Sequence, residues 1–240
     1  QPGDVYQFDV TILEAIDLLI FDENGLQAYD LGQSYRSAYE PIASTENAEG
    51  QYQFHWQVPA AISAKTWYVV LDNLAHDGDQ GMGDQGGNQS QVSLSVTKMD
   101  QSYWTPFHDL IQMDNQSSQV LLSGDDLKLD AGTSIVISAW ALQGQADVYL
   151  QTKEMYDLYS SGGVGSLFVN GGALKNIADS ASLTWLVPVE LDGQELVIIA
   201  DNTDTPVGGS DGADEVRMTV RVELAPPLIP VINDDGNSTV

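Results

Sequence analysis

The stretch Phe54–Pro59, which reads FHWQVP, is followed by Val69–Asn73, VVLDN, and this combination decides the fold because it occurs twice. The second occurrence is Leu183–Pro188, LTWLVP, followed by Ile198–Asn202, IIADN. The Trp and the first Asp are 16 residues apart in both. An acidic, glycine-rich loop follows each time. Self-similarity at a fixed period predicts that one structural unit is present in two copies.

Further matches extend the repeat in both directions. Asp17, in an apolar run, is matched 130 residues later by Asp147, and the shift is 129 at the Trp and Asp-Asn positions. The closing runs around Val96 and Val220 match with a shift of 124, so the first acidic loop is about five residues longer. Matches in the same order with a nearly constant shift predict a tandem duplication.

The repeat divides the chain of 240 residues into four segments. The first copy is expected over 1–99 and the second over 118–225, and each is long enough to bury a core of its own. Residues 100–117 form the predicted linker, whose aromatic side chains are expected to pack between the copies. Residues 226–240 contain three prolines in their first five positions, so an extended C-terminal arm is predicted.

Composition excludes several classes of protein. The formal net charge is −27, from 35 acidic and eight basic residues, so nucleic acid and anionic lipid are not expected partners. Of the acids 25 are Asp, which favours turns and chelating loops over helix faces. There is no Cys and no apolar segment of membrane-spanning length, so disulfides and membrane insertion are not expected. Solubility alone is the alternative explanation of the acidity.

Strand-like patterns dominate the sequence. Apolar and polar residues alternate over Val5–Ile12, Leu121–Leu129 and Ile135–Trp140, as half-buried antiparallel strands require. Trp67–Leu71 and Leu196–Ala200 are continuously apolar and are expected to be buried on both faces. No long helical period is present. The predicted fold is all-β, with two tandem jelly-roll-like antiparallel β-sandwiches related by internal duplication. One double sandwich with a shared core is the alternative.

The end of each copy resembles a known module. The strand Tyr68–Asn73 or Val197–Asn202, then an acidic glycine loop, then alternating valines, is similar to the closing half of secreted jelly-roll modules known as pre-peptidase C-terminal domains. The resemblance covers about 40 residues of each copy. It implies an extracellular accessory or structural module without catalysis, and it transfers no catalytic residue.

The two acidic loops are candidate calcium sites. Calcium takes six to eight oxygen ligands, which closely spaced carboxylates on a glycine-rich loop can provide. Neither loop has the spacing of an EF-hand. The same Asp-Asn pairs could instead cap a turn through side-chain to backbone hydrogen bonds. The candidate ligands are Asp72, Asn73, Asp77, Asp79 and Asp84 in the first copy, and Asp201, Asn202, Asp204, Asp211, Asp214 and Glu215 in the second.

No catalytic site is predicted. Gly208–Gly212 matches the nucleophile-elbow pattern G-x-S-x-G, but it lies in a loop before a strand and not between a strand and a helix. Asp125 and Asp126 are adjacent on a predicted strand, so they point to opposite faces and cannot act as a glycosidase pair. The three histidines, His55, His76 and His108, share no metal-binding spacing and are expected to be incidental surface or boundary residues.

These observations favour a secreted, non-enzymatic structural or surface protein. Self-assembly into a filament, coat or matrix is expected, with calcium in the acidic loops and strand donation by the arm as candidate contacts. The start Gln1-Pro2-Gly3 is expected of a mature, processed chain. The alternatives are an extracellular glycan- or protein-binding module and a viral capsid or spike protein. A glycan platform would use the aromatic residues Tyr29, Tyr35, Tyr39, Trp104, Tyr156 and Tyr159.

Overall fold

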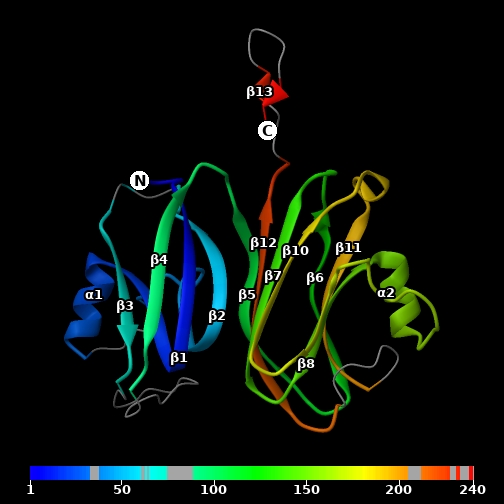
Figure 1. Ribbon diagram of the computed structural model, residues 1–240, viewed down its shortest axis with the longest axis horizontal. Coiled ribbons are helices and arrows are strands. Elements are labelled where there is room, and N and C mark those ends of the chain that lie inside the picture. The colour runs from blue at the N-terminus through cyan, green and yellow to red at the C-terminus, as the bar shows by residue number, and fades with distance from the viewer. Residues whose placement is uncertain are drawn as a thin grey trace.

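The structure is a computed structural model that describes residues 1–32, 38–60, 63, 65–74, 89–204, 212–227, 231–232 and 238–239. Two β-sandwiches lie side by side, and the C-terminal β13 lies beyond the end of the second one (Figure 1). Antiparallel strands form every sheet. The predicted all-β class is therefore confirmed. In the described part of the chain, no helix is both long and apolar enough to cross a membrane.

Two long strands and one helix open the chain. The elements of the first sandwich are β1 (Val5–Asp22), α1 (Glu23–Asp30), β2 (Thr45–Gln57), β3 (Trp67–Asp72) and β4 (Val92–Met99). The second sandwich contains β5 (Trp104–Met113), β6 (Ser117–Lys128), β7 (Ser134–Gln143), β8 (Ala146–Thr152), α2 (Lys153–Ser160), β9 (Ala173–Ile177), β10 (Ser180–Leu186), the 3-10 turn η1 (Val189–Leu191), β11 (Glu195–Asn202) and β12 (Val216–Ala225). The arm contributes β13 (Val231–Ile232) and β14 (Ser238–Thr239).

The second sandwich is a complete eight-stranded jelly roll. Its two sheets have the orders β10-β7-β12-β5 and β6-β11-β8-β9. If β5 to β12 are lettered B to I along the chain, these orders are G-D-I-B and C-H-E-F, the strand order of a jelly roll. Between the sheets lies a core of fully buried aliphatic residues that includes Leu127, Ile137, Ile198 and Val220.

The first sandwich reaches a similar arrangement with fewer strands. Residues 5–12 of β1 pair with β2 and β4, and residues 17–22 pair with β3. The register between β1 and β2 shifts between Ile12 and Ile16, where the long strand passes from one layer to the other. By the sequence match, β1 covers the places of β7 and β8, and β2 covers those of β9 and β10. Strands β3 and β4 correspond to β11 and β12.

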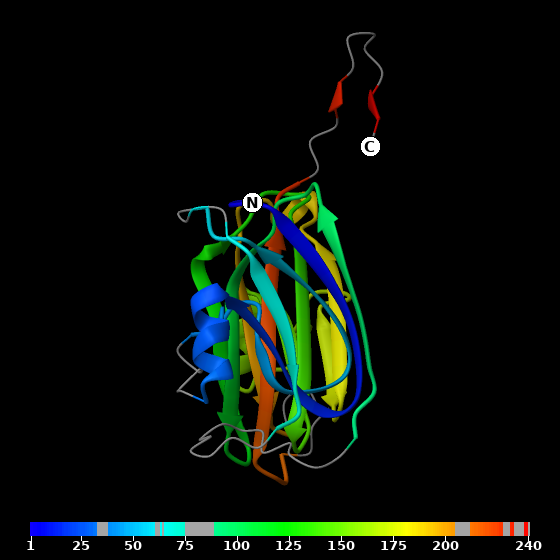
Figure 2. The same cartoon turned by 90° about the vertical axis from the view of Figure 1, so that its left-hand side faces the viewer.

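The described residues of the first sandwich contain no counterpart of β5 and β6. In the second sandwich β5 pairs with β12 and β6 pairs with β11. Strands β4 and β3, by contrast, each pair with β1 alone within the described chain. Figure 2 looks onto this side of the molecule, where β3 and β4 lie toward the viewer. Within the described residues, the first sandwich thus pairs the strands that match D to I of the second one.

The missing strands leave part of the first core uncovered. Val69 and Leu71 pair with core residues of β1, so they face the core, and Val96 lies at the matching face of β4. They are 40%, 44% and 45% exposed, respectively. Their counterparts in the second sandwich are all fully buried: Ile198, Ala200 and Val220. The expectation that Trp67–Leu71 is buried on both faces was therefore wrong, whereas Leu196–Ala200 fulfils it.

Two other expectations need correction. Residues 100–117 are not a linker, because β5 occupies most of that segment and belongs to the second sandwich.

The helix α2 was not predicted, since two turns are too short to show a period. Thr152 caps it by accepting a hydrogen bond from the Met155 amide. The pairing pattern that the two halves share is an observation, and their origin by duplication stays a prediction.

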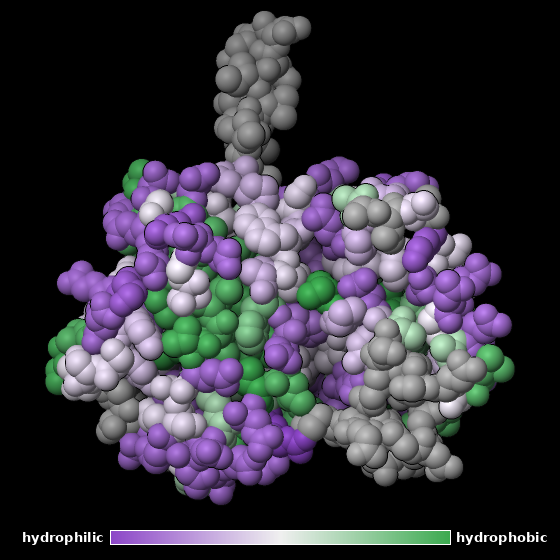
Figure 3. Space-filling view, turned by 180° about the vertical axis from the view of Figure 1, so that it is seen from behind, coloured by the Kyte–Doolittle hydropathy of each residue, from purple (hydrophilic) through white to green (hydrophobic). Residues whose placement is uncertain are grey.

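Hydrophilic residues form much of the surface. In the back view (Figure 3) they gather along the upper and lower rims, and apolar residues gather in the middle of the half that contains the second sandwich. This hydrophilic surface fits the formal net charge of −27, because charged residues are strongly hydrophilic.

Candidate functional site

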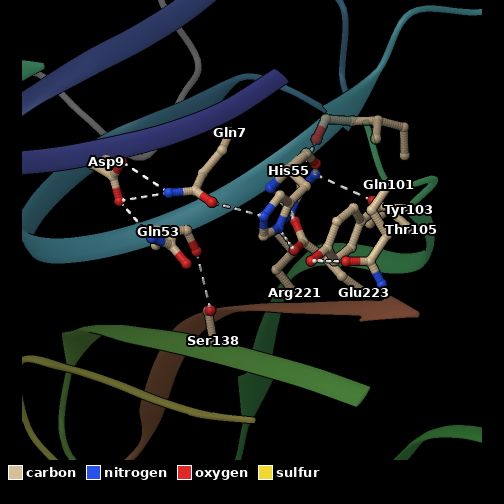
Figure 4. Close-up of polar contacts among 11 residues, drawn as sticks. Gln7, Asp9, Gln53, His55, Gln101, Tyr103, Thr105, Ser138, Arg221 and Glu223 are labelled. Atoms are coloured by element: carbon tan, nitrogen blue, oxygen red, sulfur yellow. Dashed lines mark hydrogen bonds and ion pairs between the residues drawn. The ribbon is translucent and has the colours of Figure 1, made fainter. Parts of the chain in front are cut away.

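A buried ion pair lies where the two sandwiches meet (Figure 4). Arg221 and Glu223 come from β12 of the second sandwich, and His55 comes from β2 of the first. The Arg221 Nε atom donates to Glu223 at 2.5 Å. Glu223 also accepts from the His55 amide at 2.6 Å and from His55 Nδ1 at 2.8 Å. All three side chains are almost completely buried.

The remaining donors of Arg221 reach across the junction. Its guanidinium donates to the carbonyl oxygens of Ile42 and His55, and to Thr105 Oγ1 at 3.1 Å. The same group lies 4.9 Å from the centre of the Phe54 ring. Arg221 of the second sandwich thus contacts the Ile42 carbonyl, the His55 carbonyl and the Phe54 ring of the first sandwich. It also binds Thr105 of β5. Because its donors are paired, this buried charge fixes how the sandwiches sit against each other.

The charges at the junction shift the pKa values of neighbouring groups. Burial alone would raise the pKa of Glu223, but hydrogen bonds from His55 and Arg221 outweigh it and hold the pKa below its usual range. Burial and the positive charge of Arg221 lower the pKa of His108 to about 3. Glu223 is therefore ionised and His108 neutral at physiological pH.

Aromatic packing joins the sandwiches as well. Trp140 of β7 belongs to the core cluster of the first sandwich and stacks on Tyr52 with ring centres 4.8 Å apart. Tyr103 stacks on His55 with centres 3.7 Å apart. The predicted packing of an aromatic residue between the copies is therefore seen at Tyr103. Since Trp140 enters the first core, the alternative of a shared core also holds in part.

His55 was expected to be an incidental surface or boundary residue, and this was wrong. It is 4% exposed and lies at the centre of the polar network. The sequence signal that was overlooked is Arg221 with Glu223, two charges inside the apolar strand β12. Charged residues at alternate positions of such a strand lie on one face, where they need a partner. His108 is a boundary residue, with Nδ1 3.1 Å from the Pro41 carbonyl oxygen, and His76 lies outside the described residues.

A cleft opens beside this junction. Its lining comes from both sandwiches and includes Tyr39, Pro41 and Glu46 of the first and His108 and Thr219 of the second. The Tyr39 hydroxyl donates to Glu46 at 3.0 Å. The other aromatic residues of the predicted glycan platform lie elsewhere. Tyr29 is a residue of α1 and packs on Phe21, whereas Tyr156 and Tyr159 are residues of α2 in the second sandwich. Tyr35 lies outside the described residues, and glycan binding stays a prediction.

The predicted calcium ligands are only partly described. Asp77, Asp79, Asp84 and Asp211 lie outside the described residues. Asp72 is the last residue of β3 and Asp201 the last but one of β11, close to the strand ends as the repeat predicts, and both are buried. Each accepts a hydrogen bond from the backbone amide two residues further on, Leu74 at 2.9 Å and Thr203 at 3.1 Å. The turn-capping alternative is therefore observed.

The other described candidates have structural contacts. Asn202 donates to the carbonyl oxygens of Asp114 and Asp214, at 3.1 and 2.8 Å. The backbone amide of Asp204 donates a hydrogen bond to the side-chain oxygen of Gln116. Glu215 accepts from Gln112, and Asn73 follows Asp72 at the end of β3. Among the described residues no three acidic, His or Cys side chains come together in a way that could hold a metal. Calcium binding stays a prediction.

Each sandwich contains a buried pair of carboxylates. Asp17 lies opposite Asp72, and Asp147 lies opposite Asp201, on neighbouring antiparallel strands. Asp17 accepts a hydrogen bond of 2.6 Å from the Asn47 amide, and Asp147 accepts one of 2.6 Å from the Asn176 amide. Both asparagines adopt a positive φ, 53° and 52°. The two halves therefore share an unusual backbone feature that fixes a buried acid.

The motifs set aside in the sequence have no catalytic setting in the described residues. The pattern Gly208–Gly212 lies mostly outside the described part of the chain. Asp125 and Asp126 are neighbours on β6 and both are exposed. The polar groups of Arg221, Glu223 and His55 at the junction hydrogen-bond to one another. We therefore assign this network a structural role and call it the clamp.

The structure has only a weak likeness to solved structures. An acidic stable capsid structure of Helicobacter pylori bacteriophage KHP30 matches with a TM-score of 0.28 and 11% identity, over 53% of this chain and 94% of that chain. Infectious bursal disease virus, Gt strain, gives 0.27 and 13% identity, over 93% and 57%. Sulfolobus turreted icosahedral virus gives 0.21 and 10%, over 95% and 56%. No protein-family model and no curated protein sequence matches the chain. Scores this low assign no function.

We predict that Glu223→Gln destabilises the protein by about 3–5 kcal/mol, because it leaves Arg221 buried without its counter-charge. Urea unfolding, followed by tryptophan fluorescence, measures the loss. The matched control is Glu215→Gln, immediately before the same strand, where the side chain is only partly buried. Equal unfolding midpoints for the two variants would contradict the clamp.

A second prediction concerns Asp201. Burial and the charge of Asp147 raise its pKa above the ordinary value, although hydrogen bonding to Thr203 acts in the opposite direction. The folded state thus holds this proton more tightly than the unfolded state. Stability from Asp201 is present below the ordinary pKa and is lost as pH rises through the raised pKa.

Replacing Asp201 by Asn should therefore raise the melting temperature at pH 7 and change it less near pH 4. Asn keeps the oxygen that accepts from Thr203 and removes the charge opposed to Asp147. Each kcal/mol gained corresponds to about 2–4 °C for a chain of this size. Calorimetry at both pH values measures the effect. A lower melting temperature at pH 7 than that of the unchanged protein would refute it.

Proposed function

We propose that this chain is a non-enzymatic structural protein that assembles with further copies of itself. The contact surface is the side of the first sandwich formed by β3 and β4, which we call the open side. The observation that carries the proposal is the exposure of core-facing residues on β3 and β4. Large apolar residues that belong to a core and yet face solvent mark an interaction surface. Edge strands with free backbone groups also provide a template for pairing with another chain.

The charge distribution supports pairing at this side. A chain with a net charge of −27 repels its copies over most of its surface. Strand β4 contains only one charged residue, Lys98, and β3 contains only Asp72, which is buried. The open side therefore meets an approaching copy with little of the negative charge that acts elsewhere. We expect salt to favour assembly because it screens the remaining repulsion.

The proposal has finer parts that rest on the sequence. An extracellular or cell-surface location agrees with the acidity and the absence of Cys, and calcium would offset the charge of the acidic loops. The assembled form is a filament, coat or matrix. A viral capsid is one kind of coat that the same proposal includes.

We predict that the chain forms dimers or larger species at micromolar concentration and that Val96→Arg converts them to monomers. Arginine at this position cannot be buried when a partner covers the open side. Light scattering coupled to size exclusion measures the mass of both proteins.

The matched control is Val189→Arg, because Val189 is exposed on the second sandwich, away from β3 and β4. It should assemble like the unchanged chain. A monomeric unchanged protein at all concentrations and salt conditions would overturn the proposed function. Equal loss of assembly in both variants would show that the open side is not the assembly surface.

A further inference from the structure

The second sandwich shows what the open side of the first one lacks. Strand β5 runs antiparallel to β12, and the pairs range from Val216 with Met113 to Leu224 with Trp104. Ile111 and Met113 of β5 enter the core and are almost completely buried. The same position beside β4 is empty of strands within the described chain. A strand with apolar residues on one face is therefore the shape that fits beside β4.

The order of the chain indicates which segment supplies such a strand. After β4 ends at Met99, four residues lead to β5, which is the first strand of the next sandwich. After β12 ends at Ala225, five residues lead to β13. By the sequence match β12 corresponds to β4, so the arm begins where the first strand of a following sandwich would begin. The arm thus occupies the chain position that β5 has after β4.

In the described chain, the arm pairs with neither sandwich of its own molecule. Strands β13 and β14 pair only with each other. Figure 1 shows β13 beyond the end of β12 and away from β3 and β4, which lie on the far side of the first sandwich. The sequence around β13, Leu228–Ile232, has four aliphatic residues among five. An apolar segment in this position is suited to a groove on another molecule.

We propose that the C-terminal arm of one copy adds as a strand beside β4 of a second copy and takes the place that β5 takes beside β12. This inference rests on the proposed self-assembly and names its contact. Each copy then has one donor, the arm, and one acceptor, the edge of β4. Because donor and acceptor are different surfaces, the contact is head-to-tail and repeats into a closed ring or an open filament.

Cysteine cross-linking tests this contact, since the chain contains no Cys of its own. The donor is the full chain with Ile232→Cys. The acceptor ends at Ala225, so it has no arm, and carries Thr97→Cys at an exposed position of β4. A short bismaleimide is added to the mixture, and the products are separated by mass. The expected product joins one long chain to one short chain, and an excess of the peptide 226–240 should reduce it at least several-fold.

The matched acceptor control carries Thr184→Cys on β10, which is an exposed position on an edge strand of the second sandwich. It should give little mixed product. Equal cross-linking at positions 97 and 184 would overturn the inference, as would products that join only two short chains through β4. Circular dichroism of each variant confirms that it is folded.

The same mixture separates this inference from the proposed function. If the unchanged chain still forms large species while the mixed product is absent, the arm is not the donor and self-assembly stands. If a full chain with both Thr97→Cys and Ile232→Cys is cross-linked only within single molecules, the arm closes on its own sandwich and the intermolecular contact is excluded. If no large species form at all, both proposals fail.

Discussion

An antiparallel sandwich buries its core only if a strand or loop covers each row of residues that faces the core. The second sandwich satisfies this condition with eight strands, and Val220 and Ile198 at its centre are fully buried. The first sandwich uses the same pairing pattern, but its described residues contain no strands that correspond to β5 and β6. Val96 and Val69 are then exposed although the sequence places them on the core face. The difference between the two halves follows from this one constraint.

The junction explains how the first sandwich can be ordered without those strands. Its inner side packs on the second sandwich, where Trp140 completes the hydrophobic cluster and Arg221 binds backbone carbonyl groups. Removing either partner of a buried ion pair usually costs more than the pair contributes. The network therefore specifies the arrangement more than it stabilises it. The outer side has no such support, and β3 and β4 remain as edges.

Much of the fold could be predicted from the sequence, because alternation and the repeated Trp and Asp-Asn positions report local strands directly. The strands over Val5–Ile12 and Ile135–Trp140 and the buried run Leu196–Ala200 are all present. The linker was wrong because Trp104–Met113 lies outside the repeat and pairs with β12, more than 100 residues later in the sequence. Pairing over such a distance leaves no local pattern.

The candidate site was less predictable. Asp72 and Asp201 were placed correctly at strand ends, because the repeat gives both the same position. Their partners, Asp17 and Asp147, lie on strands that are distant in sequence. The clamp at Arg221 needs the packing of two sandwiches, which no single motif encodes. Leu71 is exposed because no strand of the described chain covers its face of β3. A run of apolar residues in the sequence does not show whether another strand covers it.

The edge of β4 is open in a single molecule, and in the proposed assembly a strand of a second copy covers it. Hydrogen–deuterium exchange of the peptide containing residues 92–99, compared with that containing 216–224, tests it most directly. We expect fast exchange at 92–99 in the dilute chain that ends at Ala225, slow exchange at 216–224 in the same sample, and slow exchange at both in the assembled full-length protein. Equal protection of residues 92–99 in the two samples would contradict it.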